Sequence, residues 1–241
     1  MSDELSEQHT IASNLKGASE PVETPFESRW ATALAGDRKV LGELAADCWA
    51  PIYAWLRSFG STPEEAARRV QEFPTWLQLH PPRPDAEDFM RFSDYVQNRL
   101  GMYADAGFPP INPVVAVTID QSRAERKFAE EGSRSPEEVF ARRWAFMILE
   151  WTLSTLRAEL DADGKVAQFT YLKSFLNFSG GTEERYAEIG KEIGLSASAL
   201  RVAVFRFRQR YRELLRHWIS NTVRDESDVD GELTMLLCAA S

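Results

Sequence analysis

Six arginines gathered near the C-terminal end of the chain are the residues whose type and spacing point most directly to a chemistry. They are Arg201, Arg206, Arg208, Arg210, Arg212 and Arg216. Residues 197–216, which contain them, include a single acidic residue, Glu213, whereas the whole chain has a net charge of −9. Guanidinium groups pair with phosphates and with guanine edges, so a local basic cluster of this kind indicates nucleic-acid binding.

Two helices with a tight turn between them would position this cluster. Gly194 suits the left-handed conformation that ends a helix, and Ser196 is a favourable N-cap for the next one. After Ser196, apolar residues recur at helical spacing and occupy one side of the second helix. This arrangement is typical of a helix-turn-helix, whose second helix enters the major groove. The other side of that helix carries the candidate DNA-contacting residues Ser198, Arg201, Val202, Phe205, Arg206 and Gln209.

Two other interpretations fit the same pattern. An amphipathic helix can carry a solvated arginine face without any DNA partner. Phe205 can pack against a neighbouring helix instead of meeting a thymine methyl group. The short turn at 194–196, taken together with the basic surface, favours DNA.

The composition indicates a globular protein in a reducing compartment. Hydrophobic residues make up 44% of the 241 residues, with seven tryptophans and fourteen phenylalanines, which allows a substantial core and one or two domains. No apolar run approaches the roughly 20 residues that span a bilayer, so no membrane partner is expected. Cys48 and Cys238 lie far apart in the sequence, which fits free thiols and a cytoplasmic location.

Helical periodicity dominates from Phe26 onwards, and it predicts an all-α protein of two helical lobes joined by a linker rich in proline and glycine. In the first lobe, a helix with Thr62 as its N-cap is expected to end at Pro74, and another is expected over 85–100. The predicted organisation is a flexible tail at 1–25, a first lobe at 26–100, a linker at 101–135, a second lobe with the helix-turn-helix at 136–220, and a C-terminal extension with a helix at 221–241.

Catalytic and metal-binding patterns are missing from the sequence. His9, His80 and His217 share no spacing with one another or with the cysteines, so no zinc site is predicted. The pair Gly190-Lys191 lacks the preceding glycine and the following serine or threonine of a phosphate-binding loop. We therefore predict no catalytic residues, no metal and no cofactor.

Three stretches have a more specific character: GSTPEEAARRVQEFPTWL at 60–77, FARRWAFMILEWTLSTLRAEL at 140–160, and the two-helix stretch at 186–216, which ends LRVAVFRFRQRYRELLR. Together they resemble the bacterial RNA polymerase sigma factors of the extracytoplasmic-function class, in particular a long-form group with a C-terminal extension. The tail DVDGELTMLLCAAS is also similar to that group, and the resemblance spans residues 26–240.

The resemblance implies two partners. The first lobe would dock on the clamp helices of the β′ subunit of core RNA polymerase, with Gln71 and Glu72 on an exposed helix turn, although both could simply be solvated. The second lobe would read upstream promoter DNA, with Arg201, Phe205 and Arg206 at positions that approach DNA in the family. An anti-sigma protein is a further partner consistent with this family.

One stretch departs from the family. Residues 85–100 hold four acidic residues and two arginines, where the family has a basic, aromatic-rich helix that captures melted DNA. Two other functions therefore stay open: a stand-alone DNA-binding regulator that uses residues 136–220, or a sigma-like protein-interaction module. The C-terminal helix is expected to fold back over a lobe, because Leu233, Leu236 and Leu237 need a partner surface.

Overall fold

The computed structural model of the chain describes residues 28–82, 89–176 and 182–241. Within these ranges the regular structure is helical, and an isolated bridge pairs Arg91 with Val223. The prediction of an all-α fold is confirmed. The predicted tail at 1–25 lies outside the described residues. In the part of the chain that is described, no helix has the length and apolarity needed to cross a membrane.

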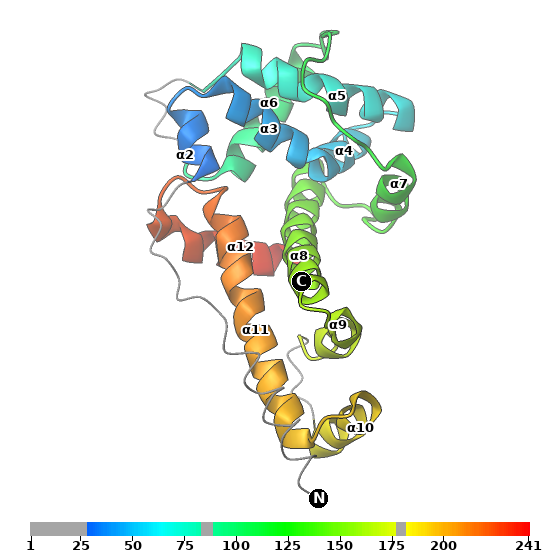
Figure 1. The fold of residues 1–241 in the computed structure, drawn as a ribbon. Coiled ribbons are helices and arrows are strands. Elements are labelled where there is room, and N and C mark those ends of the chain that lie inside the picture. The colour runs from blue at the N-terminus through cyan, green and yellow to red at the C-terminus, as the bar shows by residue number, and fades with distance from the viewer. Residues whose placement is uncertain (1–27, 83–88, 177–181) are drawn as a thin grey trace, which may run out of the picture.

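The chain order of the helices is shown in Figure 1. They are α2 (Arg29–Leu34), α3 (Arg38–Asp47), α4 (Trp49–Ser58), α5 (Pro63–Leu79), α6 (Phe92–Asp105), α7 (Gln121–Ala129), α8 (Pro136–Ala162), α9 (Val166–Lys173), α10 (Glu183–Ile193), α11 (Ala197–Ser220) and α12 (Val229–Ala240), with a short 3-10 turn at Glu226–Asp228.

The starts of the two helices that carry the family-like motifs follow local sequence signals. Thr62 caps α5 and exchanges hydrogen bonds with Glu65, and Ser135 caps α8 in the same way with Glu138. Each cap is followed by proline at the first helical position, where its missing N–H is not needed. The helix start predicted at Thr62 is confirmed.

The predicted end of α5 at Pro74 is wrong, since the helix continues to Leu79. Proline removes one backbone hydrogen bond, but Pro74 is buried and the turn after it buries Trp76 and Leu77 against the core. Burial of such side chains outweighs the loss of a single bond. The helix expected over 85–100 instead spans Phe92–Asp105, with residues 83–88 outside the described part of the chain.

Two hydrophobic clusters form the core, and the long helices α8 and α11 run from one to the other (Figure 1). The larger cluster joins α2 to α6 with the first half of α8, the last turns of α11 and α12; it includes Trp144 and Ile219 beside Trp30 and Phe92. The smaller cluster lies between the second half of α8, α9, α10 and the first half of α11. The division between clusters therefore falls within α8 and α11, and not in the segment predicted as a linker.

The segment at 101–135 follows the surface of the larger cluster. Its first residues complete α6, and α7 forms further along. The amide of Val114 donates to Thr75 Oγ1 over 3.0 Å, and the carboxylate of Glu125 accepts from Tyr53 Oη (2.6 Å) and Arg57 Nε (2.7 Å). These bonds fix the segment to α4 and α5.

The C-terminal extension connects the end of α11 to α2 and to the start of α6. Residues 221–224, which we term the C-terminal clamp, exchange backbone hydrogen bonds with two distant segments: Trp30 N donates to Asn221 O (3.1 Å), Phe92 N to Thr222 O (2.8 Å) and Arg224 N to Met90 O (2.9 Å). Beyond the clamp, α12 packs against α8 and α11.

The expectation that the C-terminal helix folds back is confirmed. Leu236 is buried and Leu233 is partly buried against the larger cluster, while Leu237 remains exposed. Glu232 on the same helix is buried, accepts a hydrogen bond from Trp144 Nε1 (3.1 Å) and lies 3.6 Å from Arg91 Nη1. The extension thus contacts residues of both predicted lobes.

Candidate nucleic-acid interface

The turn between α10 and α11 has the geometry that its sequence predicts. Gly194 ends α10 with φ +70° in the left-handed region, and Ser196 Oγ accepts from Ala199 N (3.2 Å) to cap α11. Leu195 N donates to Gly190 O over 2.8 Å, which closes the turn. The roles predicted for Gly194 and Ser196 are confirmed.

Gly190 has a role in this turn that sequence reasoning missed. It is buried, and a Cβ atom at this position would lie 2.6 Å from the carbonyl oxygen of Leu195. Only glycine lets α10 and the turn approach this closely. The signal in the sequence was a glycine inside a helical pattern, which often marks a close backbone approach.

The apolar side of α11 is packed against the smaller cluster. Leu200, Val204 and Phe207 are buried, together with Leu156 of α8 and Leu172 of α9. Partly buried side chains of α10 complete this contact. One side of α11 is thereby fixed, and its opposite side is left in solvent at the end of the molecule that lies far from α3 to α6 (Figure 1).

All of the candidate DNA-contacting residues lie on this solvent side of α11. The two apolar members are strongly exposed, Val202 by 50% and Phe205 by 66%, so Phe205 does not pack against a neighbouring helix. The exposed members are Ser198, Arg201, Val202, Phe205, Arg206 and Gln209.

Fewer arginine side chains of α11 are available to a ligand than its sequence indicates, because carboxylate and carbonyl groups from other elements bind them. Arg210 Nη2 lies 2.6 Å from Glu159 Oε1 of α8, and Arg208 Nε donates to the carbonyl oxygen of Phe175 over 2.9 Å. In addition, Arg201 pairs with Glu183 and Arg216 pairs with Asp230.

Arg206 and Arg212 differ from the other four arginines of the helix. Both are exposed, and neither has an ion pair or a side-chain hydrogen bond to any described residue. They are the guanidinium groups most readily available to a phosphate. Among the described residues, the arginines of α11 without a charged or hydrogen-bonded partner are therefore Arg206 and Arg212.

The pair implied for polymerase binding is split by the fold. Gln71 is exposed, but the side chain of Glu72 is only 7% exposed. Its carboxylate accepts from Arg68 Nη1 (2.9 Å) and from Tyr103 Oη (3.0 Å), so it serves the interior contact of α5 with α6. The expectation that both side chains lie on an exposed turn is wrong for Glu72, since helix rotation by one residue turns it inward.

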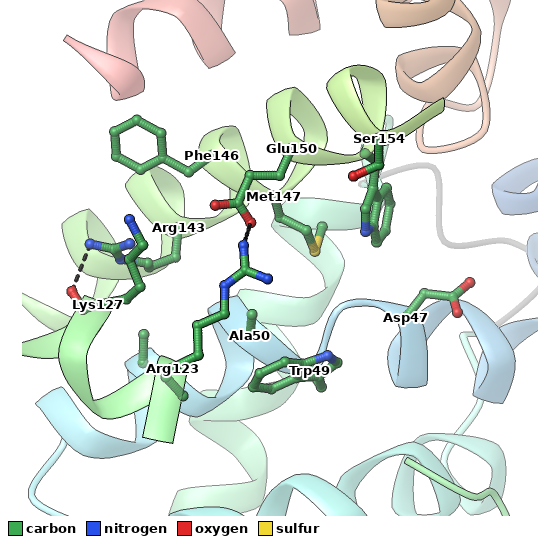
Figure 2. Close-up of a pocket in the computed structure, with 13 residues that line it drawn as sticks. Asp47, Trp49, Ala50, Arg123, Lys127, Arg143, Phe146, Met147, Glu150 and Ser154 are labelled. Carbon is green, nitrogen blue, oxygen red and sulfur yellow. Dashed lines mark hydrogen bonds and ion pairs between the residues drawn. The ribbon is translucent and has the colours of Figure 1, made fainter. Parts of the chain in front are cut away.

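A pocket of about 190 Å³ lies between α4, α7 and α8, and Figure 2 shows the residues that line it. Trp49 and Met147 form part of its apolar wall. Its cations are already paired: Arg123 Nη2 lies 2.8 Å from Glu150 Oε2, Arg143 donates to the carbonyl oxygen of Lys127 over 2.7 Å, and Lys127 itself pairs with a glutamate. This arrangement holds α7 against α8.

No family model, no curated protein and no solved structure matches this chain. Among the described residues, no three His, Cys, Asp or Glu side chains gather in a way that could hold a metal ion.

Proposed function

We propose that the chain binds duplex DNA through the exposed face of α11 and acts as a sigma factor that brings core RNA polymerase to promoters. The observation that carries the DNA-binding proposal is the placement of Ser198, Arg201, Val202, Phe205, Arg206 and Gln209 on one solvent-facing side of a helix whose other side is buried. The polymerase part of the proposal rests on the family resemblance.

The chemistry of this face suits a major groove. Arginine can form two parallel hydrogen bonds with guanine, and exposed apolar side chains such as Val202 and Phe205 can contact thymine methyl groups. Arg206 and Arg212 can neutralise phosphates on either side of the groove. An α-helix fits the width of the major groove of B-form DNA.

On the polymerase side, the exposed Gln71 remains the residue of the predicted pair that a partner can reach. Glu72 would support that surface from within by holding Arg68, whose side chain is half exposed. The proposed contact with the β′ clamp is thus centred on Gln71 and the outer face of α5.

A stand-alone DNA-binding regulator is the second candidate. The burial of Glu72 favours it, because only Gln71 of the pair implied for polymerase binding is exposed. Such a regulator would bind DNA through residues 136–220 and would need no contact with polymerase.

Selection of duplexes from a random pool with the full chain, followed by fluorescence anisotropy, tests the DNA proposal. The variant Phe205→Ala/Arg206→Ala should weaken binding of the selected duplex by about tenfold or more, since the base contact of Phe205 is worth about 1–3 kcal/mol and the phosphate contact of Arg206 is lost as well. Arg210→Ala is the matched control, because Arg210 is paired with Glu159 and Glu213. Failure to select any duplex, or equal loss in both variants, would contradict the proposal.

A pull-down with core RNA polymerase then separates the two candidate functions. Retention of the chain, weakened by Gln71→Ala, supports a sigma factor. DNA binding without retention on core polymerase supports the stand-alone regulator.

A further inference from the structure

Two arginines on the DNA-facing side of α11 have different surroundings. Arg201 pairs with Glu183 at the start of α10, and its guanidinium carbon lies 5.4 Å from the ring centroid of Tyr186. Arg206 is exposed and has no comparable contact with a described residue. The same side-chain type is therefore held at one position and left free at the other.

The support beneath Arg201 extends into the smaller cluster. The ring of Tyr186 stacks on Phe175, with 4.8 Å between centroids and 17° between planes, and Phe175 is buried. Arg185 lies over the same phenylalanine ring at 4.9 Å, and Arg208 Nε donates to the Phe175 carbonyl oxygen. These contacts fix the ring of Tyr186, so the guanidinium group of Arg201 packs against an aromatic ring of defined position.

Base recognition and phosphate recognition make different demands on an arginine. Reading a base edge needs a guanidinium with a fixed direction, because two hydrogen bonds must align with one base pair. Phosphate neutralisation tolerates a range of positions and carries no sequence information. A long side chain that is already oriented loses less conformational entropy when it binds.

We propose that Glu183 and Tyr186 are positioning residues that orient Arg201 toward a base edge, with guanine as the preferred base, while Arg206 neutralises a backbone phosphate. This inference rests on the proposed DNA-binding function of α11. In this arrangement Glu183 also has a second effect: its carboxylate, which is 72% exposed, would repel the phosphates of a bound duplex. Glu183 therefore weakens non-specific binding while it improves discrimination.

The preference for one duplex over another makes the inference testable with the full chain. The probes are a duplex selected from a random pool and a scrambled duplex of equal length, compared by anisotropy between 50 and 200 mM salt. Glu183→Gln should bind the scrambled duplex more tightly and lose about threefold or more of the preference for the selected one. Tyr186→Phe retains the ring and should behave as the wild type, whereas Tyr186→Leu should lose preference.

Substitutions of Arg201 and Arg206 should have different effects on the two duplexes in the same assay. Arg201→Gln should lose about tenfold in affinity for the selected duplex, with little change on the scrambled one, and the loss should map to one base pair. Arg206→Gln should weaken both duplexes alike and lower the slope of log affinity against log salt by about one.

Uniform effects overturn the inference: if Glu183→Gln changes both duplexes by the same factor, or if Arg206→Gln relaxes specificity at one base pair, the assigned roles are wrong. Absence of any DNA binding by the wild type would instead remove the proposed function itself. Circular dichroism on each variant identifies unfolding. If Tyr186→Leu unfolds, Glu183→Gln and Arg201→Gln still decide between the assigned roles and a uniform effect.

Discussion

Replacing Gly190 by alanine is expected to destabilise the protein at the turn that presents α11. The added Cβ would lie 2.6 Å from Leu195 O and 3.6 Å from Ala197 N. The carbonyl oxygen of Leu195 cannot easily move away, because the amide of the same residue is bonded to Gly190 O over 2.8 Å. The new methyl group therefore has to push α10 and the turn apart.

The magnitude follows from two opposing terms. Alanine in place of glycine gains about 1 kcal/mol in helix propensity. Overpacking costs about 1–3 kcal/mol, and a backbone neighbour places the cost toward the upper end. We expect Gly190→Ala to lower the free energy of unfolding by about 1–2 kcal/mol and to weaken binding of the selected duplex.

Urea denaturation of Gly190→Ala and two matched variants measures this effect. Gly231→Ala in α12 has nothing within 4 Å of its added Cβ, so it should stabilise the protein by about 0.5–1 kcal/mol. Gly194→Ala also meets open space but has φ +70°, and its cost of about 1–2 kcal/mol reports backbone strain alone. Equal stabilities for Gly190→Ala and Gly231→Ala would refute the close approach of α10 to the turn.

Two further predictions concern buried carboxylates. Glu72→Ala should lower the free energy of unfolding by about 1–3 kcal/mol, because Tyr103 Oη loses its acceptor. Gln71→Ala should change the free energy of unfolding by less than about 0.5 kcal/mol. Similar effects of the two variants in chemical denaturation would contradict the inward placement of Glu72. Burial raises the pKa of Glu232 above its ordinary value of 4.5, against the opposing effects of Arg91 and Trp144. Its ionised form therefore weakens the fold, and the stability of the wild type relative to Glu232→Gln should rise as the pH falls from neutral toward 4.5. A difference that stays constant in denaturation curves across this pH range would show that the site is not desolvated.

Features encoded within a few neighbouring residues could be predicted from the sequence. The cap at Thr62, the left-handed glycine at 194 and the cap at Ser196 depend on local backbone chemistry, and the structure has them where they were expected. The solvent-facing side of α11 was also predictable, because a period of about 3.6 residues assigns each residue to a face.

Features that depend on distant parts of the chain could not be predicted in this way. The acidic partners Glu159, Glu183 and Asp230 come from other helices, so a count of charges along α11 overstates its free positive charge. The burial of Glu72 depends on Tyr103, which lies 31 residues further along. The continuation of α5 past its proline likewise depends on tertiary packing, which local propensity does not contain.

The length of α11 matters because the two ends of this helix are held by different parts of the fold. This helix has 24 residues, which corresponds to a rod of about 36 Å at a rise of about 1.5 Å per residue. The C-terminal clamp at 221–224 holds the C-terminal end of α11, which is the base of this rod. Phe205 and its neighbours lie nearer the N-terminal end, which is its tip. A tilt of about 5° at the base would carry the tip through about 3 Å, roughly the rise of one base pair along the duplex. Because the smaller cluster also fixes Leu200, Val204 and Phe207 to α8 and α9, such a tilt has to move those helices together with the exposed face of α11.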